Sequence, residues 1–207
     1  NGTRLQYGDL VVQAAPPPTG KIVNVDHQAN TVTLDAPLAN PEAYHGAVLQ
    51  VSNELHRTSY MVQRAETKGQ QTLVHLGDVL CLVGMGAVAE FATKESTLVA
   101  DREFVAYGRT EHDRHAGRWI YNEDKTRCFR LAAITGGKRL RLEGVSGDLR
   151  AIFTDADGDG RRLYWISDLG PGDTWRLPTA TWIKRQGPGL YEVQAQTKVT
   201  LTLPKGK

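Results

Sequence analysis

The sequence predicts an all-β protein, an antiparallel β-sandwich or barrel-like fold that is divided into two β-subdomains. Three observations lead to this fold class. Apolar and polar residues alternate with a period of two in many short runs. Gly, Asn and Asp residues, which favour turns, separate these runs at intervals of roughly 8–12 residues. No window of about 12 residues keeps the apolar spacing of a helix without an interrupting Gly or Pro.

The first two runs, 21–26 and 31–35, flank the turn-forming residues 27–30 and predict a β-hairpin. A single short turn of helix is expected at 40–45. The further predicted strands are 47–51, 58–64, 72–76, 79–83, 87–92, 104–107, 118–121, 127–134, 139–143, 150–154, 163–168, 173–177, 181–184, 189–194 and 199–203.

The stretch 94–101 is the expected boundary between an N-terminal β-subdomain, 1–93, and a C-terminal β-subdomain, 102–207. A similarity between 20–35 and 130–143 supports two sub-units, since each segment reads as strand, turn and strand ending in an acidic residue. The similarity covers one hairpin from each half.

Composition excludes several classes of protein. The net charge is +2, so nothing in the overall balance demands a nucleic-acid partner. No run approaches the roughly 20 apolar residues that a membrane-spanning helix needs. We expect a mature or excised piece of a longer protein that is secreted, periplasmic or on the cell surface, because the chain opens on Asn1. The two cysteines, Cys81 and Cys128, lie in apolar runs typical of buried free thiols, and a disulfide between them is the alternative.

The sharpest chemical signal is an acidic loop in which Asp155, Asp157 and Asp159 alternate before Gly160. A hard divalent cation takes six to eight oxygen ligands, and this spacing wraps the chain around one such cation. We therefore predict a Ca²⁺ site formed by these carboxylates and the carbonyl of Arg161. Asp168 is the nearest residue that could complete it, since Ile166 stands where a calcium loop of the helical type has Glu. The alternative is a solvated acidic turn.

Two other clusters are candidates for chemistry. His56, Arg57 and Tyr60 supply a base and a cation within five residues, which a lyase acting beside a uronic carboxylate requires. The alternative is an ordinary exposed strand face. A second segment, rich in Arg and aromatic residues, suits acidic sugars through stacking and bidentate ion pairs, or else a contact with a neighbouring domain. Its candidate substrate-binding residues are Tyr107, Arg109, Arg118, Trp119 and Tyr121.

Several of these segments together resemble the C-terminal β-region of bacterial polysaccharide lyases of the heparinase II/III-like type. The resemblance rests on the hairpin 20–35, on His56 and Tyr60, on the loop 155–160 and on 170–173. It implies a non-catalytic β-module of a secreted carbohydrate-active protein, whose partners are a polysaccharide or a missing N-terminal catalytic domain. Two alternatives stay open: a lyase acting on uronic-acid polysaccharide through Tyr60, His56 and Arg57, and a purely structural or assembly domain.

Overall fold

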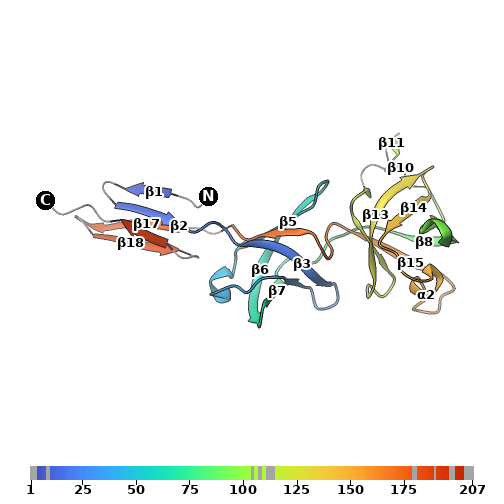
Figure 1. Ribbon diagram of the computed structural model, residues 1–207, viewed down its shortest axis with the longest axis horizontal. Coiled ribbons are helices and arrows are strands. Elements are labelled where there is room, and N and C mark those ends of the chain that lie inside the picture. The colour runs from blue at the N-terminus through green and yellow to red at the C-terminus, as the bar shows by residue number, and fades with distance from the viewer. Residues whose placement is uncertain are drawn as a thin grey trace.

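The computed structural model describes residues 4–7, 10–103, 105–106, 109–110, 115–178, 181–188, 190–195 and 199–202. These residues form three β-units in a row, two closed barrels and a smaller strand assembly at one end (Figure 1). The strands make up 54% of the chain and helices 7%, so the all-β prediction is confirmed. Within this described part, no helix has the length and apolar character needed to cross a membrane.

The first barrel closes six antiparallel strands around one apolar core. Its strands, in chain order, are β3 (Thr19–Asp26), β4 (Thr31–Leu34), β5 (Val48–Ser52), β6 (Arg57–Lys68), β7 (Gln71–Leu76) and β16 (Thr174–Arg176). Alternate residues point inward because successive side chains of a strand face opposite sides. Leu34, Leu49 and Trp175 are among the fully buried side chains of this core. The predicted hairpin is confirmed as β3 and β4, with Val25 opposite Val32.

The second barrel has its own core and its own six antiparallel strands. These are β8 (Leu82–Ala92), β9 (Thr97–Ala100), β12 (Trp119–Asn122), β13 (Cys128–Thr135), β14 (Arg139–Glu143) and β15 (Leu163–Ser167). Ile120, Leu131 and Ile166 are completely buried in its centre. Because each barrel encloses a separate apolar cluster, each has the internal core that a domain needs.

The two barrels share one strand order. When the six strands of each are numbered along the chain, both close in the order 1-2-5-4-3-6, so β3 corresponds to β8 and β16 to β15. The similar hairpins of the sequence, β3–β4 and β13–β14, therefore occupy different places in the two barrels. The second barrel is inserted between the fifth and sixth strands of the first. The sheets therefore do not follow the expected subdomains 1–93 and 102–207, because the first barrel takes strands from both sides of the second barrel in the chain.

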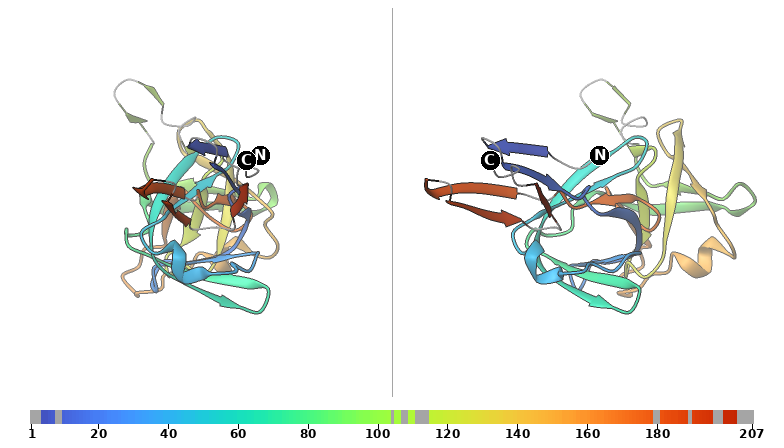
Figure 2. Two further views of the ribbon diagram at one scale, coloured as in Figure 1. Left: turned by 90° about the vertical axis from the view of Figure 1, so that its left-hand side faces the viewer. Right: turned by 60° about the vertical axis from the view of Figure 1, so that its left-hand side comes forward.

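The third unit joins strands from both ends of the chain. A three-stranded sheet has the order β1 (Arg4–Tyr7), β2 (Leu10–Ala14) and β19 (Val199–Thr202), so that the first and last strands lie in one sheet. A hairpin of β17 (Thr181–Gly187) and β18 (Leu190–Ala195) lies beside it (Figure 2). A separate two-stranded ribbon, β10 (Val105–Ala106) with β11 (Arg109–Thr110), belongs to the second half of the chain.

Three local predictions have definite outcomes. The turn of helix at 40–45 is confirmed as the 3₁₀-helix η1 (Pro41–Tyr44); a second short 3₁₀-helix, η2 (Thr93–Glu95), precedes β9. The predicted strands 79–83 and 87–92 are joined in the single strand β8, because Gly84 and Gly86 continue it rather than end it. β8 begins at Leu82, so 79–81 lie in the connection before it. Gly86 is needed in β8, since a Cβ would lie 2.3 Å from the hydroxyl of Tyr164.

The predicted strand 150–154 is wrong, because its first residues form the helix α2 (Leu149–Ile152). The side chain of Asp148 caps this helix by accepting a hydrogen bond from the backbone N–H of Arg150 at 3.0 Å. Leu149 and Phe153, four residues apart, are both fully buried on the side facing the second barrel's core. Tertiary burial of this pair therefore decides the helical conformation of a short apolar run.

Candidate functional site

The acidic loop connects α2 to β15 and is closed by hydrogen bonds to its own carboxylates. The two oxygens of Asp155 accept the backbone N–H groups of Gly158, at 2.8 Å, and Gly160, at 2.9 Å. Asp159 accepts from Arg161 at 2.8 Å. Gly158 and Gly160 have φ values of 77° and 86°, the left-handed conformation that glycine adopts without a steric cost. The loop therefore folds sharply and gathers its acidic side chains at the surface.

Glu123 is a member of this acidic cluster that the sequence analysis missed. One carboxylate oxygen from each of Glu123, Asp155 and Asp157 lies within 4.8 Å of the other two. Glu123 also accepts the backbone N–H of Ala156 at 3.1 Å. The cause is the pairing of β12 with β15, which sets Asn122 opposite Tyr164 and brings the end of one strand beside the loop before the other.

Asp168 does not lie with these three carboxylates. Its carboxylate accepts a hydrogen bond from Nε of Arg118 at 2.7 Å, and both side chains are largely buried. The expected set of carboxylates therefore changes in two places. Glu123 lies beside Asp155 and Asp157, whereas Asp159 is not among these three, and Asp168 is bonded to Arg118 beside the strand pair β12–β15.

The three candidate lyase residues do not converge. Tyr60 is 3% exposed in the core of the first barrel, and burial raises the pKa of its hydroxyl. His56 donates through Nε2 to the carbonyl of Ala116 at 2.7 Å, while Arg57 is exposed. A catalytic base needs to reach the substrate and to lose its proton near the working pH. Tyr60 meets neither condition.

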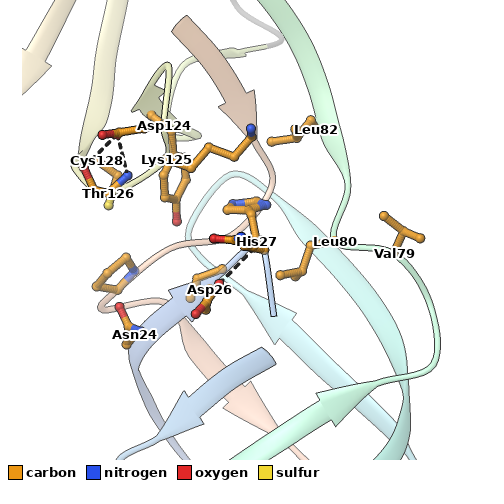
Figure 3. A pocket seen from close by; sticks show the side chains of 14 residues that line it. Asn24, Asp26, His27, Val79, Leu80, Leu82, Asp124, Lys125, Thr126 and Cys128 are labelled. Atoms are coloured by element: carbon orange, nitrogen blue, oxygen red, sulfur yellow. Dashed lines mark hydrogen bonds between the residues drawn. The ribbon is translucent and has the colours of Figure 1, made fainter. Parts of the chain in front are cut away.

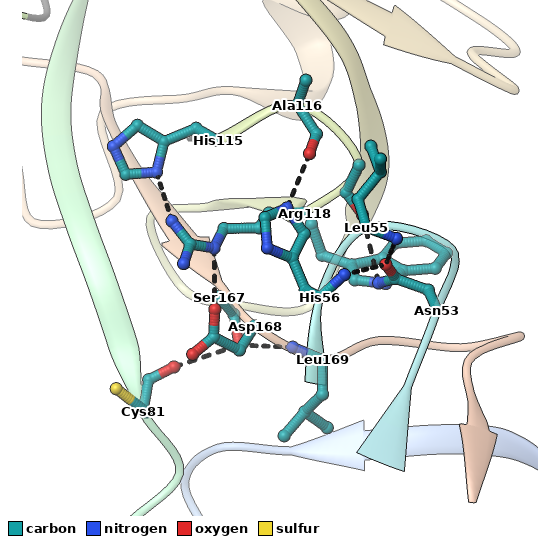
Figure 4. Close-up of polar contacts among 12 residues, drawn as sticks. Asn53, Leu55, His56, Cys81, His115, Ala116, Arg118, Ser167, Asp168 and Leu169 are labelled. Carbon is teal, nitrogen blue, oxygen red and sulfur yellow. Dashed lines mark hydrogen bonds and ion pairs between the residues drawn. The ribbon is translucent and has the colours of Figure 1, made fainter. Parts of the chain in front are cut away.

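The candidate sugar-binding residues that the structure describes lie at the junction of the two barrels. Tyr121 is 2% exposed and donates to the carbonyl of Leu169 at 3.2 Å, so its ring offers no face to a sugar. Arg118 is bonded to Asp168 and to His115 (Figure 4). Trp119 is bonded to Asp173. Tyr107 lies outside the described residues, and only the backbone of Arg109 is described. The expected stacking surface is therefore wrong for Tyr121, and the polar groups of Arg118 and Trp119 are already bonded.

A buried carboxylate, Asp173, is the centre of this junction. It is 2% exposed and accepts from Trp119 Nε1 at 2.9 Å, from the backbone N–H of Gly170 at 3.0 Å and from Asn53 Nδ2 at 3.3 Å. Desolvation by burial raises the pKa of this carboxyl above its usual value, although these hydrogen bonds oppose the rise. Since Asn53 lies in the first barrel and Trp119 in the second, Asp173 ties the two barrels together.

A cavity of ≈ 610 Å³ lies elsewhere along the same junction (Figure 3). The first barrel contributes Asp26 and His27, the connection before β8 contributes Val79 and Leu80, and the second barrel contributes Lys125. This volume is within the roughly 300–1,000 Å³ of small-molecule sites, which often form between domains.

Burial shifts the pKa values of two side chains that line the cavity, His27 and Cys128. The imidazole of His27 meets the ring of Tyr121 edge-on, with centroids 4.7 Å apart, and its Nε2 is buried without a hydrogen-bond partner among the described residues. Burial and the nearby Lys125 lower the pKa of His27 to about 4. Burial raises the pKa of the Cys128 thiol to about 11, so this thiol stays protonated and unreactive near neutral pH. Cys128 and Cys81 are not joined in a disulfide.

The fold and these contacts define a double six-stranded β-barrel protein with a buried polar junction. Comparison with protein-family models, with curated proteins and with solved structures found no match in any of the three.

Proposed function

We propose that this chain is a non-catalytic β-barrel module of a secreted polysaccharide-processing protein, and that its acidic loop holds a structural Ca²⁺. A non-catalytic role is supported by the contacts of the candidate catalytic and binding residues, which are bonded to other parts of the protein or buried. His56 and Asp173 are bonded across the junction, Arg118 is bonded to Asp168 beside the strand pair β12–β15 of the second barrel, and Tyr60 is buried. The link to polysaccharide processing rests on the resemblance to the heparinase II/III-like β-region.

The calcium part of the proposal rests on the acidic cluster. Glu123, Asp155 and Asp157 offer oxygens close enough to one another to be shared by one cation, and carboxylate oxygens are the ligands that Ca²⁺ prefers. Backbone carbonyls of the loop and water would complete the six to eight oxygens. Because the loop joins α2 to β15, a cation there would fix the entry into β15, which pairs with β8 and β12 in the second barrel.

The calcium part is tested by thermal unfolding with Ca²⁺ or with a chelator. A ligand that binds only the folded state at about a hundredfold excess over its Kd stabilises it by about 2.7 kcal/mol. For a chain of this size, Tm shifts by roughly 2–4 °C per kcal/mol, so we expect Ca²⁺ to raise Tm by about 5–10 °C. Asp157→Ala and Glu123→Gln should each remove most of this shift. Glu143→Gln, which alters an exposed acid on β14 outside the loop, should keep it.

A Tm that is the same with Ca²⁺ and with chelator would show a plain acidic turn and overturn the calcium part. The non-catalytic part is tested separately with uronic-acid polymers, by following the absorbance of an unsaturated product. We expect no turnover by this chain. Turnover that is lost in Tyr60→Phe would instead show that the chain is a lyase.

A further inference from the structure

The cavity between the barrels carries unused hydrogen-bonding groups on the side of the first barrel. Asp26 closes the β3–β4 turn through Oδ1, which accepts from Gln28 and Ala29, while its Oδ2 accepts nothing from the residues that the structure describes. The side-chain amides of Asn24 and Gln28 also line the cavity, and neither is bonded to any described residue. Asn24, Asp26 and Gln28 are exposed to solvent, so their free hydrogen-bonding groups are accessible to a ligand in the cavity.

The rest of the cavity lining is mixed, because the second barrel adds Asp124, Lys125 and Thr126 beside several apolar side chains. Val79, Leu80 and Pro171 line the cavity, and Val79 is 85% exposed at its rim, the most exposed large apolar side chain of the described chain. The size of the cavity is within the range of small-molecule sites, and Val79 offers an apolar contact at its edge. The ligand must then present both hydroxyl-like groups and apolar faces, as a sugar ring does.

The charges around the cavity restrict the ligand further. Asp26 and Asp124 carry two negative charges, whereas Lys125 carries one positive charge, and its ammonium group lies 4.6 Å from the centre of the Trp165 ring. His27 is neutral near pH 7 because its pKa is lowered to about 4. The lining thus has a net negative charge, which repels a uronate and accepts a ligand without charge.

We infer that this cavity binds an uncharged oligosaccharide, with Asn24, Asp26 and Gln28 bonding its hydroxyl groups and Val79, Leu80 and Pro171 covering its carbon–hydrogen faces. The inference rests on the proposed role in polysaccharide processing. It assigns the contact to a place where the sequence analysis expected none, and it replaces the acidic polysaccharide with a neutral one.

The experiment is isothermal titration calorimetry of the whole chain with neutral tetrasaccharides of glucose, xylose, mannose and galactose, and with trigalacturonate. We expect at least one neutral tetrasaccharide to bind and trigalacturonate to bind more weakly. Val79→Arg places a long charged side chain at the cavity rim and should weaken this binding at least tenfold. Asn24→Ala should weaken it several-fold.

Val48→Arg is the matched control, because Val48 is another exposed valine, 46% exposed, that does not line the cavity. It should leave the affinity unchanged, and both Arg variants should keep the wild-type Tm. The inference is overturned if none of the tetrasaccharides binds, if binding survives Val79→Arg, or if trigalacturonate binds best. The calcium shift and the turnover assay do not depend on these titrations, so the proposed function can stand when this inference fails.

Discussion

Trp119 of the second barrel donates its indole N–H to the carboxylate of Asp173, 54 residues later in the chain, at 2.9 Å. Asp173 directly precedes β16, the strand that closes the first barrel, and its own backbone carbonyl accepts the N–H of Ile22. This pair therefore joins the second barrel to the point where the chain returns to the first. It also sets the conditions for the first three predictions.

Trp119→Phe should destabilise the protein by about 1–3 kcal/mol, because the buried carboxylate of Asp173 loses its shortest hydrogen bond while the aromatic volume is largely kept. Urea unfolding measures the change. If the loss of stability comes from packing alone, Trp119→Phe will lower the free energy of unfolding by the same amount in the wild type and in an Asp173→Asn background. The interaction energy of the double-mutant cycle will then be near zero.

Gly170→Ala should cost about 1–3 kcal/mol, since a Cβ at Gly170 would lie 2.3 Å from the Trp119 ring, which the bond to Asp173 holds in place. The matched control is Gly187→Ala, where nothing lies within 4 Å of the added Cβ. Thermal unfolding of both variants tests this. Equal stability of Gly170→Ala and the wild type would mean that the Trp119 ring can move away from the added Cβ. That result would contradict a rigid junction.

The stability of the protein should depend on pH through Asp173. Burial raises the pKa of this carboxyl in the folded state above 3.8, so the folded state binds the proton more tightly than the unfolded state. The contribution of Asp173 to stability is therefore greatest at low pH and declines as pH rises from 3.8 through the raised pKa. The stability of the wild type relative to Asp173→Asn, measured by urea unfolding at several pH values, should decline over the same window. A difference that stays constant with pH would contradict this.

His27 should act in the opposite direction. Its folded-state pKa is lowered to about 4 from 6.5, so the unfolded state binds the proton more tightly between these values. Stability should therefore be lost as pH falls from 6.5 towards 4. His27→Phe keeps an aromatic ring against Tyr121 and cannot be protonated, so the variant should gain stability relative to the wild type across this window. Urea unfolding of both proteins at pH 7.5 and pH 4.5 tests this prediction. A stability difference between His27→Phe and the wild type that is the same at both pH values would contradict it.

The local sequence predicted the regular elements well where the pattern was strong. In β7 the burial alternates along the strand, with Thr72, Val74 and Leu76 inside, and this alternation is visible in the sequence. The acidic loop was likewise visible from the spacing of Asp155, Asp157 and Asp159. Where the local signal was ambiguous it failed, as in the run from Leu149 to Phe153, because a short apolar stretch suits a strand or a helix until its burial is known.

The candidate sites depended on contacts between distant parts of the chain. Arg118 and Tyr121 have the composition of a sugar surface, yet Arg118 is bonded to Asp168 and Tyr121 to Leu169, some 50 residues away. Glu123 joins the acidic loop only through the pairing of β12 with β15. The spacing of residue types could not reveal these relationships, since it carries no information on strand pairing.

By itself the sequence determined the all-β class, the first hairpin and the acidic turn, because alternation, turn residues and glycine φ preferences act over a few neighbouring residues. Only the tertiary structure decided that β16 closes the first barrel after an inserted second barrel, that Asp173 is buried between them, and that the cavity containing His27 lies along the same junction. The physical reason is that barrel closure and burial are set by the packing of the whole chain, which brings together residues more than 100 positions apart.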